Sequence, residues 1–249
     1  MTRTVHVEHC MGTVFTLDVR DPGDWNHAIA EAVAWLYQVD AVFSTYRPDS
    51  DLNRLGRREL RLADAHPDLA LVLDLCAQVQ AETGGAFSAL FEGRVDPTGL
   101  VKGWAIERAS DLLRQHGSGN HAVNGGGDLQ LAGESAPGQP WRVGIAASGC
   151  GGVGPVVAGQ DFAVATSGTA ERGQHILDPF TGRAAEGLFS ASVTGPSLTR
   201  ADAYATAAFV LGTDAMRWVK TVPGYELLLI WPDGRTEASP GWPAFRSTE

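Results

Sequence analysis

The sequence predicts an α+β fold, because helical and strand patterns mix along the chain without a regular βαβ alternation. Its 249 residues, of which 44% are hydrophobic, are enough to bury one large core. The 30 glycines and 13 prolines are spread through loops and are not gathered in a linker, and no internal repeat is visible. We therefore expect a single domain over residues 1–249, with a mixed sheet and flanking helices.

Strands are predicted where β-branched and apolar residues alternate with polar ones. The expected strands are Met11–Val19, His121–Leu131 (interrupted by three glycines), Trp141–Ile145, Asp161–Thr166, Ser190–Thr194 and Glu226–Trp231.

Helices are predicted where apolar residues recur at intervals of three and four. The expected helices are one that Asp24 caps and that carries Ile29, Val33 and Leu36, one from about Pro67 to Gly84–Gly85, one from about Val101 to His116, and one over Asp202–Leu211.

Charge and composition exclude several classes of protein. Lys and Arg total 19 against 29 for Asp and Glu, which gives a formal charge of −10. The sequence has no cluster of basic residues, which argues against a nucleic-acid-binding protein. No apolar run is long enough to span a membrane. The first residues contain no apolar signal region, so we expect a cytoplasmic protein, or an exported form whose leader has been removed. The scattered Cys10, Cys76 and Cys150 are expected to be reduced thiols.

Two glycine-containing stretches are candidate ligand sites. In Asn124–Asp128 (NGGGD), the glycines allow the backbone either to approach a ligand or to make a tight turn. Asp96–Gly103 (DPTGLVKG) leads into a helix whose first N–H groups suit a phosphate, and Asp96 or Thr98 is placed to cap it. Lys102 opposes the helix dipole there, so it either has a role in the site or is a solvated surface cation.

Asp202 and Thr206 are four residues apart in a predicted helix, so their side chains share one face. A carboxylate with a hydroxyl is an oxygen donor set that suits Mg²⁺. The alternative is an N-terminal capping Asp followed by a Thr that bonds back to its own helix.

The stretch Gln174–Gly182 (QHILDPFTG) has the Asp, Pro and Gly spacing of a type I turn. If the residues before the turn form a strand, His175 and Leu177 share one face. The turn explains Asp178, Pro179 and Gly182 but not His175, which is either a structural histidine or a catalytic one.

These stretches together resemble the ApbE family, the FAD:protein FMN transferases. The motifs that carry the resemblance occur in the family order: MGT (Met11–Thr13), FSTYRPDSDLNRL (Phe43–Leu55), TGGAF (Thr83–Phe87), DPTGLVKGWAIERA (Asp96–Ala109), NGGGDLQL (Asn124–Leu131), VATSG (Val164–Gly168), HILDPFTG (His175–Gly182) and SVTGPSLTRADAYATAAFVLG (Ser192–Gly212).

The resemblance implies an α+β fold with a T-fold-like core that holds FAD. It also implies an Mg²⁺-dependent enzyme that cleaves FAD, joins FMN through its phosphate to a threonine of an acceptor protein, and releases AMP. Two alternatives stay open: an FAD pyrophosphatase with water as the acceptor, and a non-catalytic FAD-binding protein.

The resemblance also implies a set of site residues. It assigns His175 as the base that takes the proton of the acceptor hydroxyl, and Gly99 (through its carbonyl), Asp202 and Thr206 as Mg²⁺ ligands. The positions implied to contact the flavin nucleotide are Met11, Tyr46, Phe87, Ser88, Ala89, Asp96, Lys102 and Leu177.

Overall fold

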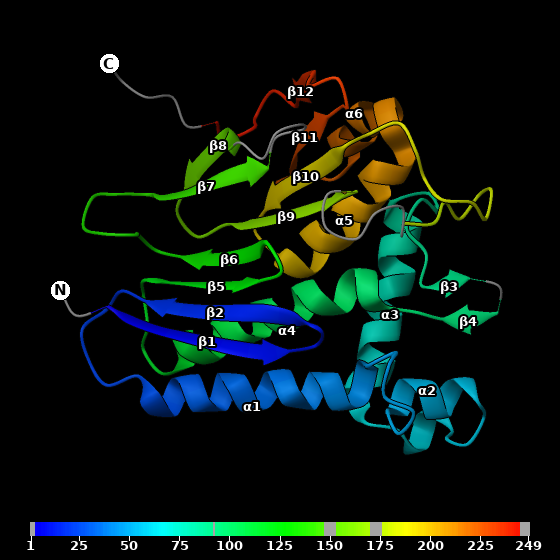
Figure 1. The fold of residues 1–249 in the computed structure, drawn as a ribbon, viewed down its shortest axis with the longest axis horizontal. Coiled ribbons are helices and arrows are strands. Elements are labelled where there is room, and N and C mark those ends of the chain that lie inside the picture. Colours follow the sequence, from blue (N-terminus) through cyan, green and yellow to red (C-terminus); the bar gives the residue numbers. More distant parts are fainter. Residues whose placement is uncertain (1–2, 92, 147–152, 170–175, 245–249) are drawn as a thin grey trace.

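A computed structural model describes residues 3–91, 93–146, 153–169 and 176–244 (Figure 1). The strands in these ranges are β1 (Thr4–Cys10), β2 (Thr13–Val19), β3 (Leu90–Phe91), β4 (Arg94–Val95), β5 (His121–Gly125), β6 (Asp128–Ala132), β7 (Trp141–Ala146), β8 (Val153–Gly159), β9 (Ala163–Gly168), β10 (Ser190–Gly195), β11 (Glu226–Ile230) and β12 (Thr236–Ala238). The helices are α1 (Asn26–Phe43), α2 (Asp51–Gly56), α3 (Pro67–Glu82), α4 (Thr98–Gln115), α5 (Leu198–Leu211), α6 (Ala215–Trp218) and the short 3₁₀ turns η1 (Leu62–Asp64), η2 (Gly212–Asp214) and η3 (Val219–Thr221).

An eight-stranded antiparallel sheet organises the molecule, with the strand order β1-β2-β5-β6-β9-β10-β11-β12. The first and the last strands of the chain lie at its two edges, so the sheet unites segments from both ends of the sequence. Helices α1, α4 and α5 lie alongside the sheet in Figure 1. Strands β7 and β8 form a separate two-stranded ribbon. The predicted α+β class is confirmed.

Strand alternation gives the sheet two buried faces, because successive side chains point to opposite sides. In β11, Leu227 and Leu229 belong to the main core that the helices share. Leu228 and Ile230, between and after them, pack instead with Ile145 of the β7–β8 ribbon. The helices therefore cover one face and the ribbon covers part of the other.

Helices α1 and α4 pack closely beneath the sheet, and aromatic residues join them. The indole Nε1 of Trp35 in α1 donates a hydrogen bond to the carbonyl of Ala105 in α4, at 3.0 Å. The Trp35 and Trp104 rings meet edge to face, with centroids 4.9 Å apart. These contacts hold α4 against α1.

The strand expected over Asp161–Thr166 lies two residues later, at Ala163–Gly168. Two other expected strands differ from those observed because of a hairpin turn. The strand expected over Met11–Val19 begins only at Thr13, because Met11 and Gly12 have φ of 52° and 71° and turn the chain back from β1. The segment His121–Leu131 is likewise two strands, β5 and β6, joined at Gly126 and Gly127 with φ of 58° and 89°. The glycines of NGGGD thus make a tight turn.

Helix positions are largely as expected, and their starts are the main differences. Helix α3 begins at Pro67 and ends before Gly84, as predicted. Helix α4 begins three residues before Val101, at Thr98, whose N–H donates to Asp96 Oδ1 at 3.0 Å. Helix α5 begins at Leu198, so Asp202 lies inside the helix and is not its cap. Apolar periodicity locates these helices, but the first residue of each helix is set by local hydrogen bonds and turns.

Two further expectations concern membranes and thiols. Among the described residues no helix is long and apolar enough to cross a membrane. Cys10 and Cys76 are buried free thiols, and burial raises their pKa values to about 11 and about 12, so both are protonated at neutral pH. Cys150 lies outside the described residues.

Candidate active site

A cavity of about 370 Å³ opens where the N-terminal halves of α4 and α5 meet the ends of the sheet strands. Its wall is assembled from segments far apart in the sequence. They are the loop Ala86–Ser88, the start of α4, the turn Gly126–Asp128, strands β7 and β9, the stretch Ile176–Pro179, and α5. The volume falls in the range of small-molecule sites, and its wall combines apolar surface with a few convergent polar groups.

The structure brings most of the predicted site residues together in this cavity. Those that line it are Phe87, Ser88, Asp96, Gly99, Lys102, Leu177, Asp202 and Thr206. Segments separated by more than a hundred residues thus converge, which explains why the motifs share one site.

Three predicted flavin contacts do not line the cavity. Tyr46 is 93% exposed in the turn before α2, and Ala89 packs against the main core. Met11 lies in the β1–β2 turn, although that hairpin adjoins the cavity wall, since the N–H of Gly126 donates to the carbonyl of Val14 at 3.2 Å. His175 lies outside the described residues.

A buried ion-pair network occupies the floor of the cavity. The ammonium of Lys102 forms ion pairs with Asp128 Oδ2 and, at 3.2 Å, with Asp202 Oδ1. Asp128 is 1% exposed, and its other oxygen accepts the N–H of Thr166 at 2.9 Å. Lys102 is therefore not a solvated surface cation, and its unfavourable place at the start of α4 is offset by two carboxylates.

The second oxygen of Asp202 is anchored by the backbone of α4. Asp202 Oδ2 accepts the N–H of Gly103 at 2.9 Å. A Cβ at position 103 would lie 2.5 Å from the carbonyl oxygen of Leu198 and 2.8 Å from the Cβ of Asp202. Only glycine permits α4 and α5 to approach closely enough for this bond, so the glycine orients the carboxylate.

Thr206 lies one helical turn beyond Asp202, as the spacing predicts. Its hydroxyl bonds back to the carbonyl of Asp202 at 3.3 Å, and it also pairs with the hydroxyl of Ser167 at 3.1 Å. A Cβ at Gly99 would lie 3.6 Å from the Thr206 hydroxyl, so helices α4 and α5 touch here. Back-bonding to the helix and a place at the cavity are both features of this threonine.

The charges along the cavity are unbalanced. Among its described lining residues, Asp96, Asp128 and Asp202 are carboxylates and Lys102 is the single cation. An anionic ligand such as a phosphate would be repelled by this excess unless a cation accompanied it. The arrangement thus suits the joint binding of a metal cation and a phosphate.

Two members of the network, Asp128 and Ser167, were not among the predicted site residues. Asp128 ends the NGGGD turn, and a carboxylate directly after a glycine turn is a sequence signal that could have identified it. Ser167 had no comparable signal, because its contact with Thr206 depends on how β9 lies against α5.

Comparisons with known proteins agree with this architecture. A family described as "ApbE family" matches residues 11–93 and 89–229. The chain is 33% identical over 131 residues to an FAD:protein FMN transferase of Vibrio cholerae, covering 48% of this chain and 39% of that protein. It is 35% identical over 168 residues to a protein of the same name from Treponema pallidum, covering 59% and 46%. The matches thus span less than half the length of these relatives.

A solved structure, the flavin transferase ApbE from Vibrio cholerae, superimposes with a TM-score of 0.83 at 23% identity, covering 96% of this chain and 97% of that one. It shares the fold, including the large sheet with flanking helices. Together with the family match, which extends over most of the sequence, this establishes that the chain belongs to the ApbE family.

Proposed function

We propose that the chain is an Mg²⁺-dependent FAD:protein FMN transferase, and that residues 1–249 form one ApbE-like domain. In this reaction the acceptor threonine oxygen bonds to the phosphorus of the FMN half, the pyrophosphate P–O bond breaks, and AMP leaves. The observation that carries the proposal is the anchored Asp202 carboxylate, which lies beside Lys102 and Thr206 in the cavity. The names of the relatives support the choice of FAD and of a protein acceptor.

The donor set in the cavity fits a magnesium ion. Asp202 has one oxygen tied to Gly103, which leaves the other directed toward Lys102, a position that already attracts positive charge. Gly99 lines the cavity together with Asp202 and packs against Thr206, since a Cβ at Gly99 would lie 3.6 Å from the Thr206 hydroxyl. Carboxylate, carbonyl and hydroxyl oxygens are the ligands that Mg²⁺ prefers. We assign Gly99, Asp202 and Thr206 to it.

When bound, a magnesium ion would polarise the phosphoryl oxygens and offset the negative charge of the pyrophosphate. The residues of the chain contribute the positioning. Lys102 supplies a fixed ammonium near the phosphates, and the Gly126–Gly127 turn lines the cavity without side chains that would keep a ligand away from the backbone. Phe87 and Leu177 offer apolar surface for the flavin or adenine rings.

The acceptor hydroxyl requires a base, because a threonine hydroxyl is a weak nucleophile at neutral pH. We assign this role to His175, which would take the proton of the hydroxyl as the new P–O bond forms. The turn that follows supports the assignment: Leu177 lines the cavity, and Asp178 accepts the N–H groups of Phe180 and Gly182 at 2.8 Å each. Leu177, two residues after His175 in the sequence, thus lies at the cavity wall.

The direct test is to incubate the protein with FAD and Mg²⁺, with and without a candidate acceptor domain, and to follow the products by mass spectrometry. Transfer predicts AMP in solution and an acceptor whose mass rises by one FMN, on a threonine. FMN appearing free in equal amounts with and without acceptor would instead show a pyrophosphatase. Intact FAD, bound but not cleaved, would show a binding protein. Cell fractionation would test the expected cytoplasmic location.

A further inference from the structure

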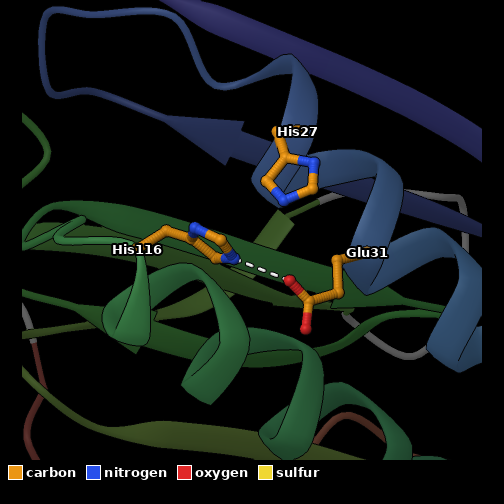
Figure 2. A group of neighbouring side chains, drawn as sticks. All are labelled: His27, Glu31 and His116. Carbon is orange, nitrogen blue, oxygen red and sulfur yellow. Dashed lines mark hydrogen bonds and ion pairs between the residues drawn. The ribbon is translucent and has the colours of Figure 1, made fainter.

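We propose that His27, Glu31 and His116 form a surface site for a divalent transition metal, at the end of α4 opposite the cavity (Figure 2). His27 and Glu31 lie four residues apart in α1, so their side chains project from one face of that helix. His116 directly follows α4 and approaches from the neighbouring helix. The site would be separate from the flavin chemistry and does not depend on the proposed function.

The three side chains converge already. A ligand atom from each lies within 4.8 Å of the other two. His116 Nε2 and Glu31 Oε2 are 2.7 Å apart, and the His27 and His116 rings meet edge to face with centroids 5.3 Å apart. In a tetrahedral zinc site with bonds of about 2.0–2.2 Å, neighbouring donors lie roughly 3.3 Å apart. Small rotations of exposed side chains are enough to close the remaining gap.

The donor types select the class of metal. Two imidazole nitrogens and one carboxylate suit Zn²⁺, Co²⁺, Ni²⁺ or Cu²⁺, whereas Mg²⁺ and Ca²⁺ prefer sites made of oxygen alone. Three protein ligands leave a fourth position for water, and the exposure of all three residues provides access. The carboxylate also offsets part of the metal charge. We therefore expect selectivity for borderline-soft metals over Mg²⁺.

The site is too far from the cavity to share a metal with it. Lys102 and His116 are at opposite ends of α4, and their separation of 14 positions corresponds to roughly 21 Å at 1.5 Å per residue. A metal here would instead join the start of α1 to the end of α4. Because it would bind the folded chain and not the unfolded one, it would stabilise the fold by a free energy that grows with the logarithm of its concentration above Kd.

The experiment is a titration of metal-stripped protein, kept in excess Mg²⁺, with ZnCl₂ and CoCl₂. Calorimetry gives stoichiometry, Co²⁺ absorption reports nitrogen ligation, and thermal unfolding reports stabilisation. We expect one Zn²⁺ whose binding raises the melting temperature, and a shift in the unfolding constant of about 100-fold at 100 times Kd. Because protons compete for imidazole nitrogen, binding should weaken at acidic pH.

Variants decide where the metal binds. His27→Ala and His116→Ala should each weaken Zn²⁺ binding by at least about 10-fold and abolish the thermal shift, while the unliganded proteins unfold as the wild type does. His6→Ala is the matched control, since His6 pairs with Glu8 at 3.2 Å on β1 and belongs to no group of three such ligands within the described ranges. Equal Zn²⁺ binding in all variants, or none in the wild type, would overturn the proposal.

Discussion

The two ends of helix α4 carry opposite kinds of polar cluster. At the N-terminal end, Lys102 is held between the buried carboxylates Asp128 and Asp202, inside a cavity. At the C-terminal end, His116 faces His27 and Glu31 on the exposed surface (Figure 2). One helix therefore joins a buried oxygen-rich cluster to an exposed nitrogen-rich one.

Burial accounts for the contrast between these two polar clusters. Buried charges must be paired and hydrogen-bonded, so the network around Asp202 is fixed by Gly103 and by the approach of α5. Exposed side chains hydrate freely, so the cluster around His116 can rearrange around a ligand at little cost. Substitutions in the buried cluster should therefore cost more activity and stability than substitutions in the exposed one.

The largest effect is expected from Asp202. Asp202→Ala removes a proposed metal ligand and leaves the Gly103 N–H without its acceptor. We expect Mg²⁺-dependent FAD cleavage to fall by more than roughly 100-fold, with a stability loss of about 1–3 kcal/mol for the unpaired buried group. Asp202→Asn keeps an acceptor oxygen, so it should lose activity but little stability. Turnover at limiting Mg²⁺ and denaturant unfolding check both; full activity in either variant would refute the metal assignment.

The next effect is expected from His175. If this residue takes the proton of the acceptor hydroxyl, His175→Ala should slow FMN transfer by about a hundred- to ten-thousand-fold and leave FAD binding intact. Single-turnover measurements with acceptor, beside FAD binding by fluorescence, separate the two. Parallel losses of FAD affinity, thermal stability and rate would indicate a structural histidine, and wild-type transfer would place the base elsewhere.

A third prediction concerns acid stability beneath the exposed end of α4. His121 is fully buried, and its two ring nitrogens lie 2.7 Å from the Ser110 hydroxyl and 2.8 Å from the Ser118 hydroxyl. Burial, aided by Arg114, lowers the pKa of His121 from 6.5 to about 4. The neutral ring therefore contributes stability that is complete above pH 6.5 and is lost as the pH falls toward 4, by about 3 kcal/mol in all.

Denaturant unfolding between pH 7 and pH 4 measures this loss. His121→Gln should be less stable than the wild type at neutral pH but should show a shallower decline in acid. His116→Gln, which removes the exposed histidine of the same region, should retain the wild-type decline. An identical slope in the His121 variant would show that other groups control the acid transition.

A smaller effect is expected from Gly103. Gly103→Ala would press a methyl group against Leu198 and Asp202, and such overpacking costs about 1–3 kcal/mol. Because the shift also moves Asp202, the Mg²⁺ requirement should rise. Gly56→Ala is the control, since a Cβ there meets nothing within 4 Å and the helix should be unchanged or gain slightly. Equal stability of both variants would mean that α4 and α5 separate without cost.

The smallest effect on FMN transfer is expected from removing both histidines at the C-terminal end of α4. The double variant His27→Ala/His116→Ala should transfer FMN at the wild-type rate in Mg²⁺, because its residues lie at the far end of α4 from the cavity. Steady-state transfer, measured with and without Zn²⁺, tests this. A substantial rate change in metal-free buffer would show that the ends of α4 are coupled.

Much of the fold followed from local patterns. Apolar periodicity located α3 and α4 to within a few residues, and the apolar run in Glu226–Trp231 identified a strand that is buried on both faces. The same local rules missed β1 and β8, because an edge strand with partly exposed residues and a strand that begins among glycines carry weak signals. The local rules also did not divide His121–Leu131 into two strands, because that division depends on β5 pairing with β6 across the turn.

The family, the order of the motifs and the one-turn spacing that puts Asp202 and Thr206 on one helix face can all be read from the sequence. Which groups meet depends on how the helices and strands pack. Asp128 and Lys102 pair across 26 positions, and His27 meets His116 across two helices, because packing of α4 against α1 and α5 brings them together. Periodicity reports which face a side chain occupies along one helix, whereas contact between helices depends on their separation, which for α4 and α5 follows from the missing side chain of Gly103.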